Sequence, residues 1–96
     1  MDFYLIPDEK PKPKSQTEIE FAGNITEIDF DILQNESIIE KRFDYYTDFR
    51  LTNEFVKSKL DFINIKKLNN NPSVYKFKEI MEKANAKNNG LLAYCD

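Results

Sequence analysis

The stretch from Asn69 to Lys87 constrains the fold of this chain more than any other part of the sequence. Three asparagines break the preceding structure, and Asn71 with Pro72 then forms a helix start, because Pro72 lies where a missing amide donor costs nothing. Apolar residues recur at helical spacing from there on, at Val74, Phe77, Ile80, Met81 and Ala84. Asn88-Asn89-Gly90 supplies a left-handed stop. The sequence therefore predicts a helix over residues 72–87.

Two further helices are predicted from caps and apolar spacing. Thr52 is a suitable cap for a helix over residues 53–64, whose apolar positions are Phe55, Val56, Leu60 and Ile63. Residues 25–34 are ambiguous, because apolar and acidic residues alternate there as in a strand. Thr26 and Asp29 nevertheless resemble a capping box, and acidic residues are favourable in the first turn of a helix. We therefore expect a helix over residues 27–34.

Short apolar runs predict four strands. The first covers residues 2–6 and stops at Pro7, and the second covers residues 17–22. β-branched and aromatic residues favour a strand over residues 38–46. The final run, residues 91–94, is too short for a helix, and we expect it to pair beside the first strand. Between the first two strands, two prolines among three lysines predict an extended surface loop, Lys10-Pro11-Lys12-Pro13-Lys14.

Together these elements predict an α+β fold, with a small, mostly antiparallel sheet and two or three helices packed on one face. A chain of 96 residues supports a single modest core, so we expect one domain over residues 1–96. No apolar run is longer than five residues, whereas a membrane-spanning helix needs about 20, so we expect no membrane span. The chain start lacks the pattern of a secretory leader, and a lone cysteine fits a reducing compartment. We expect a cytoplasmic protein.

The residue inventory argues against catalysis and metal binding. The chain has no histidine and one cysteine, the residues on which acid–base, nucleophilic and transition-metal sites mainly draw. Asp44 and Asp48 are a carboxylate pair that would suit an enzyme, but their spacing brings them together only in a helix. Tyr45 and Tyr46 argue against a helix there. We expect no enzyme, no metal and no cofactor.

Charge is distributed unevenly along the chain, although the formal net charge is only -3. Residues 18–49 carry nine carboxylates against two cations, a local charge of -7, whereas residues 50–96 carry +4. Local potential steers partners more than total charge does. The lysines of residues 57–87 leave nucleic-acid binding as an alternative, but Glu79 and Glu82 among them are typical of a solvated helix face, and a pI near 5.0 repels phosphate. We favour a protein partner.

Residues Phe43 to Arg50 combine four aromatic residues with two carboxylates and an arginine. Tyr and Arg are enriched at binding hot spots, and adjacent carboxylates steer a basic partner. The sequence thus predicts a partner-binding surface formed by Asp44, Tyr45, Tyr46, Asp48 and Arg50. This surface requires the carboxylates between Glu18 and Asp48 to gather into one exposed patch ringed by tyrosines. The alternative is a loop whose aromatic side chains complete the core.

Three features resemble the small acidic bacterial immunity proteins that neutralise toxins of interbacterial competition systems. The opening Met1-Asp2-Phe3-Tyr4-Leu5-Ile6 resembles the aromatic first strand common in these proteins. Residues 49–60 are similar to a strand end followed by a Ser/Thr-capped helix, and the size and acidity agree. The resemblance implies a stoichiometric inhibitor whose partner is a basic toxin domain, and it leaves the oligomeric state open.

Overall fold

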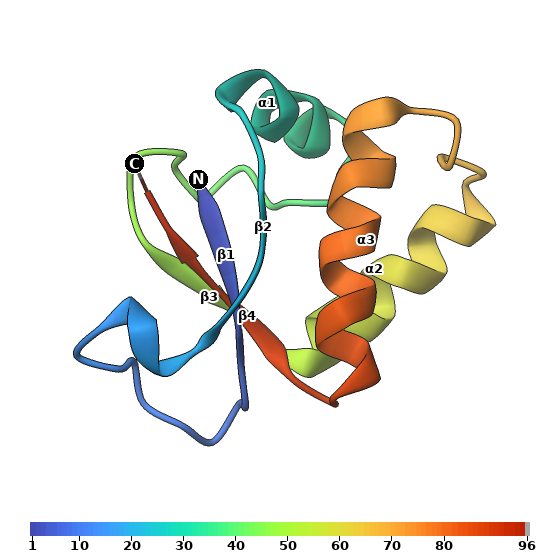
Figure 1. The fold of residues 1–96 in the computed structure, drawn as a ribbon. Helices are drawn as coiled ribbons and strands as arrows, with labels where there is room; N and C mark the ends of the chain where they lie inside the picture. Colours follow the sequence, from blue (N-terminus) through green and yellow to red (C-terminus); the bar gives the residue numbers. More distant parts are fainter. Residues whose placement is uncertain (96) are drawn as a thin grey trace.

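The computed structural model describes residues 1–95, which form a four-stranded antiparallel sheet and three α-helices (Figure 1). The strands are β1 (Asp2–Ile6), β2 (Glu20–Asn24), β3 (Phe49–Leu51) and β4 (Gly90–Tyr94), in the spatial order β2-β1-β4-β3. The helices are α1 (Glu27–Asn35), α2 (Asn53–Ile65) and α3 (Pro72–Ala86), with a short 3-10 helix, η1 (Gln16–Glu18). The predicted α+β class is confirmed. Within the described residues, no helix combines the length and the hydropathy that a bilayer crossing requires.

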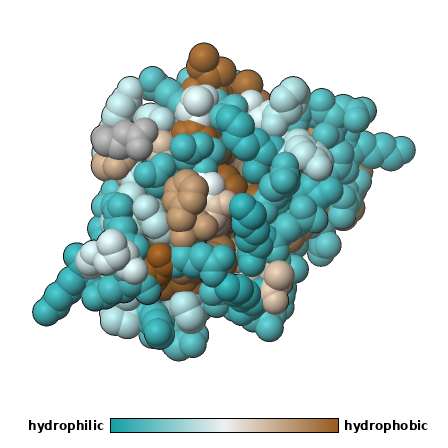
Figure 2. Space-filling view, in the orientation of Figure 1, coloured by the Kyte–Doolittle hydropathy of each residue, from teal (hydrophilic) through white to brown (hydrophobic). Residues whose placement is uncertain are grey.

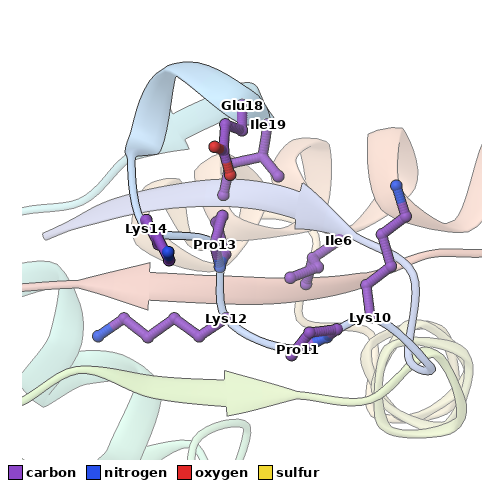
Figure 3. A pocket seen from close by; sticks show the side chains of 8 residues that line it. All are labelled: Ile6, Lys10, Pro11, Lys12, Pro13, Lys14, Glu18 and Ile19. Atoms are coloured by element: carbon purple, nitrogen blue, oxygen red, sulfur yellow. The ribbon is translucent and has the colours of Figure 1, made fainter.

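The two faces of the sheet have different coverings. Side chains alternate along a strand, so Phe3 of β1 and Leu91 of β4 point into the main core, whereas Ile6 and Leu92 point to the opposite face. On the core side, α3 contacts β1, β2 and β4, and α1 and α2 both pack against α3 (Figure 1). The loop of residues 7–19, between β1 and β2, passes over the opposite face (Figure 3). We call this loop the strap.

Aromatic rings from distant parts of the chain meet in the main core. Phe77 of α3 is fully buried, and its ring centroid lies 5.3 Å from that of Phe3. Phe49 stacks on Phe43 at 4.4 Å and lies 6.3 Å from Phe30. Each fully buried phenylalanine contributes about 1.5–3 kcal/mol relative to an exposed one. Helix α3, β1 and β3 are thus held together by ring packing.

The predicted helix starts are confirmed. The Thr26 hydroxyl accepts a hydrogen bond from the Asp29 amide at 3.1 Å, and the Asp29 carboxylate accepts one from the Thr26 amide at 2.9 Å. This capping box explains why α1 forms a helix although its apolar residues alternate as in a strand. Thr52 caps α2 and Asn71 caps α3. All three helices lie within one residue of the predicted bounds.

Each α-helix of the described chain ends in the same backbone motif. Ser37, Lys67 and Asn88 follow the three helix ends and have φ values of 62°, 56° and 54°, in the left-handed region. The amide of the next residue donates to a carbonyl in the last helical turn, at 2.9 Å after α1, 3.0 Å after α2 and 2.9 Å after α3. This is the Schellman arrangement, here built without glycine. The chain therefore reverses sharply after every helix.

The predicted strand over residues 38–46 is wrong, because this segment consists of turns and irregular backbone. The left-handed turn at Ser37 sends Ile38-Ile39 into the core as two consecutive, fully buried residues. Two buried neighbours break the alternation of a strand. The Gln34 side chain donates to two carbonyls of the segment at 3.2 and 2.9 Å, and so satisfies groups that a pairing strand would otherwise satisfy.

The strand predicted over residues 17–22 starts and ends later, as β2. Ser15 caps the turn of η1, so the chain becomes extended only afterwards. Gly23 continues the strand with a φ of 149°, and the Ile80 side chain lies 2.8 Å from the position that a Cβ atom would take. The missing side chain lets α3 approach this edge of the sheet. The expected pairing of the last strand with the first is confirmed, since β4 pairs antiparallel with β1.

Candidate functional site

The structure divides the segment from Phe43 to Arg50 between the core and two separate surfaces. Three of its four aromatic side chains pack against the main core, namely Phe43, Tyr45 and Phe49. Asp44 and Tyr46 line a depression beside α1. Asp48 and Arg50 instead bind the strap. The five predicted contact residues are therefore not brought together in one surface.

Tyr46 is held across α1 with its ring exposed. The side chain is 63% exposed, and its hydroxyl donates to the Glu27 carboxylate at 2.9 Å. The Asp44 carboxylate accepts a hydrogen bond from the Tyr46 amide at 2.8 Å, which fixes the backbone end of the residue. The hydrogen bond to Glu27 raises the pKa of the Tyr46 hydroxyl. Polar contacts at both ends thus orient an aromatic ring that the core does not cover.

Tyr45 points into the fold and supports this arrangement. Its ring lies edge-on to Phe30, with centroids 5.6 Å apart. Its hydroxyl accepts a hydrogen bond from the Met1 amino group at 3.1 Å. The Tyr45 and Tyr46 rings are nearly perpendicular, with centroids 5.2 Å apart. Tyr45 is therefore a partly buried support for Tyr46, and it also lines the depression to which Asp44 and Tyr46 contribute.

Acidic and apolar side chains meet on the outer side of α1. Glu27, Asp31, Asp44 and Tyr46 line a shallow depression of about 310 Å³, to which Lys41 and Arg42 also contribute. Ile28 is 72% exposed and neighbours Asp31 on the next turn of the helix. In Figure 2, the hydrophobic colour at the top of the view lies over α1. We call this set the α1 surface: Glu27, Ile28, Asp31, Asp44 and Tyr46.

The nine carboxylates between Glu18 and Asp48 do not form the single patch that the sequence suggested. Within the described chain, four of them bind lysine or arginine side chains, in the pairs Glu20–Lys87, Asp29–Lys76, Glu40–Arg42 and Asp48–Lys12. A carboxylate already paired with a cation adds little to the field around the molecule. Of the other five, Glu27, Asp31 and Asp44 belong to the α1 surface, whereas Glu18 and Glu36 lie outside it, so only part of the predicted patch is present.

Asp29 is the carboxylate that binds most tightly within the fold. It accepts hydrogen bonds from the Ser73 hydroxyl at 2.7 Å and from the Lys76 amine at 2.6 Å, both on α3. Burial alone would raise its pKa, but the hydrogen bonds from Lys76, Thr26 and Ser73 outweigh burial and hold the pKa well below its ordinary value. The sequence indicated Asp29 only as a cap, because its partners on α3 lie more than 40 residues away.

Asp48 and Arg50 hold the strap. The Arg50 guanidinium donates at 3.1, 3.4 and 2.6 Å to three strap carbonyls, those of Pro7, Asp8 and Lys10. The Asp48 carboxylate accepts from the Lys12 amine at 2.8 Å and from the Cys95 amide at 2.9 Å. The hydrogen bond from Lys12 is the main reason that the pKa of Asp48 is lowered. Both side chains thus have partners inside the molecule, on a different side from Asp44.

Several lysines that would serve nucleic-acid binding are used inside the fold. Five of them donate to oxygen atoms of the described chain, namely Lys59, Lys76, Lys78, Lys83 and Lys87. An amine that already binds a protein oxygen has to break this bond to reach a phosphate. The nucleic-acid alternative therefore receives no support from the arrangement of these lysines.

Comparison with known proteins found no relative. No family model matches the chain, and neither a curated protein nor a solved structure matches it.

Proposed function

We propose that this chain is a stoichiometric protein-binding module, an immunity-type inhibitor that neutralises a cognate toxin, and that it binds through the α1 surface. The observation that supports this most is the exposed Tyr46 ring, which is held by Glu27 beside Ile28 and two further carboxylates. An aromatic side chain oriented by hydrogen bonds and left uncovered by the fold is available for contact with another protein.

Apolar contact supplies the attraction in this proposal. Ile28 and Tyr46 are 72% and 63% exposed, and burying a large aliphatic side chain in an interface contributes about 1.5–3 kcal/mol. Tyrosine is among the residues that most often dominate binding energy. Since the hydroxyl of Tyr46 is already bound to Glu27, ordering its side chain on binding costs less entropy.

Charge supplies the choice of partner. Glu27, Asp31 and Asp44 face Lys41 and Arg42 in the depression beside α1, and Arg42 is already paired with Glu40, so the carboxylates are in excess and a basic protein surface is complementary. A toxin that acts on nucleic acid carries such a surface, because it has to hold phosphate groups. Attraction between opposite charges raises association rates to about 10⁸ M⁻¹s⁻¹ or more at low salt. The resemblance to small acidic immunity proteins agrees with this pattern.

The first experiment captures the partner from a native lysate with the immobilised chain and measures the dissociation constant with both proteins purified. Tyr46→Ala should weaken binding at least about 30-fold, because it removes the central aromatic contact. Tyr75→Ala is the matched control, since Tyr75 is a half-exposed tyrosine on α3 that does not line the depression beside α1. It should change the dissociation constant by less than about twofold.

Two outcomes contradict the proposal. If a folded Tyr46→Ala variant binds as tightly as the original chain, the α1 surface is not the contact surface. If the captured partner keeps its full activity in the complex, the chain is a binding protein without an inhibitory role. Co-expression gives an independent readout, because an inhibitor should relieve the growth arrest that its partner causes.

A further inference from the structure

The strap stands away from the sheet and leaves a cavity beneath it (Figure 3). The cavity has a volume of about 400 Å³, within the range of roughly 300–1,000 Å³ that is typical of small-molecule sites. Its apolar lining consists of Ile6 from β1, Ile19 from the end of the strap, and the two prolines Pro11 and Pro13. The strap is held by polar contacts of Arg50 and Asp48, and Ile6 beneath it is only 1% exposed, so Ile6 forms a small part of the cavity floor.

Positive charge surrounds this apolar lining. Lys10, Lys12 and Lys14 all line the cavity, against the single carboxylate of Glu18. Lys12 is bound to Asp48 and lies 5.0 Å from the ring centroid of Tyr94. Lys10 and Lys14 make no side-chain hydrogen bond or ion pair within residues 1–95. Figure 3 shows these two lysines on opposite sides of the cavity. Two amines without partners thus flank an apolar pocket in a chain whose net charge is negative.

We propose that this cavity binds a small organic anion with an apolar body, of the class of a medium-chain carboxylate. The apolar body lies against Ile19 and the two prolines, with Ile6 at the floor, and the anionic group lies at the rim beside Lys10 or Lys14. The strap crosses above the cavity, which suits a small ligand better than the surface of a protein. The site shares no residue with the α1 surface and is independent of the proposed inhibitor function.

The experiment uses the intact chain and three probes with one hydrocarbon chain: octanoate, 1-octanol and octylamine. Each is titrated while the amide signals are followed by NMR. Octanoate should shift the amides of Ile6, Ile19 and residues 10–14 (Pro11 and Pro13 have none), and it should bind at least about fivefold more tightly than 1-octanol. Octylamine should bind most weakly, because its charge has the same sign as the lysines. Hexanoate should bind more weakly than octanoate, by up to about fourfold for each methylene removed.

Charge variants distinguish specific binding of an anion from non-specific hydrophobic binding. Replacing both Lys10 and Lys14 by alanine should weaken octanoate about fivefold and leave 1-octanol unchanged. Glu18→Gln should strengthen octanoate about twofold, since it removes a charge of like sign. The matched control replaces the exposed Lys57 and Lys66 of the α2 region and should change neither probe. All of these side chains are exposed, so each variant should fold.

Equal affinity for octanoate and octylamine overturns the proposal, and so does an absence of octanoate binding at millimolar concentration. Amide shifts that centre on the main core or on the α1 surface overturn it as well. No partner protein enters this experiment. A failure here therefore leaves the inhibitor proposal standing, and an unchanged dissociation constant in Tyr46→Ala leaves the cavity standing.

Discussion

The two faces of the sheet differ in what holds their coverings in place. On one face, fully buried apolar side chains such as Phe3, Phe77 and Leu91 join the sheet to α3. On the other, the strap is held by Arg50 and by the ion pair between Lys12 and Asp48, and a cavity remains beneath it. Apolar packing scales with buried area, whereas exposed polar contacts contribute little each. Ile6 and Leu92 are buried on the strap face too, but the larger apolar cluster lies on the α3 face. Most of the stability is therefore expected there, while the strap face keeps open space and charge available for a ligand.

The largest expected effect on stability comes from removing a buried side chain between α3 and the sheet. Phe77→Ala removes a fully buried ring that packs against Phe3, and it should lower the free energy of unfolding by about 3–5 kcal/mol. Urea denaturation measures this loss. Tyr75→Ala, on the same helix but half exposed, should cost less than about 1 kcal/mol. Equal losses in the two variants would mean that the α3 face is not the main source of stability.

A second test compares one ion pair from each side of the molecule. The Asp29 side chain is 11% exposed and that of Asp48 is 33% exposed. Asp29→Asn should therefore lower the free energy of unfolding by about 1–3 kcal/mol, and Asp48→Asn by less than about 1 kcal/mol. Urea denaturation at neutral pH compares the two. An equal loss would mean that the strap contacts contribute as much to the free energy of unfolding as the contacts between α1 and α3.

The same pair predicts a pH dependence. Because folding lowers the pKa of Asp29, its ionised form stabilises the fold above the pKa of the unfolded chain, about 4, and this contribution disappears as the pH falls through the folded value. The difference between the original chain and Asp29→Asn should thus be full at pH 6 and smaller at pH 3. Denaturation curves at the two pH values test this, and a difference that grows with acid would contradict it.

Replacing Arg50 is expected to act on the strap locally rather than on the whole fold. Arg50→Ala removes three hydrogen bonds to the strap but no core contact. The free energy of unfolding should therefore change by less than about 1.5 kcal/mol. Hydrogen exchange of the Lys10 and Ile19 amides, which bond within the strap, should become about tenfold faster, while amides of α3 stay protected. Arg42→Ala is the control, because Arg42 pairs with Glu40 and does not touch the strap. Faster exchange in α3 would show that the two coverings open together.

The helices could be predicted because their signals are local. The side chains of Thr26, Thr52 and Asn71 each bond an amide two or three residues away, so a short window of sequence contains the whole interaction. The strand expected over residues 38–46 failed because its backbone depends on a left-handed turn at Ser37, which residue propensities do not reveal. Strand β3 is only three residues long and is specified by pairing with β4, about 40 residues later.

The candidate site could be predicted only in part. The density of aromatic and charged residues indicated the segment that contains Asp44 and Tyr46, and both lie on the α1 surface. The sequence could not separate them from Asp48 and Arg50, because the distinction comes from strap residues about 40 positions earlier. The cavity beneath the strap was missed for a similar reason. The pattern of its lysines and prolines predicts a solvated loop, and no short stretch of sequence shows that Ile6 and Ile19 line the same cavity.

The left-handed residues after the three helices have a consequence for how this sequence can change. A residue with a side chain costs roughly 1–2 kcal/mol more in that conformation than in the right-handed one, whereas glycine adopts both readily. Substituting glycine for Ser37 or Lys67 should therefore raise stability, whereas Asn88 already adopts this conformation more readily than most residues. Selection removes variants that fall below a threshold and does not drive a protein to its maximum. Such substitutions would raise the free energy of unfolding, and the fold could then tolerate destabilising changes at its surface.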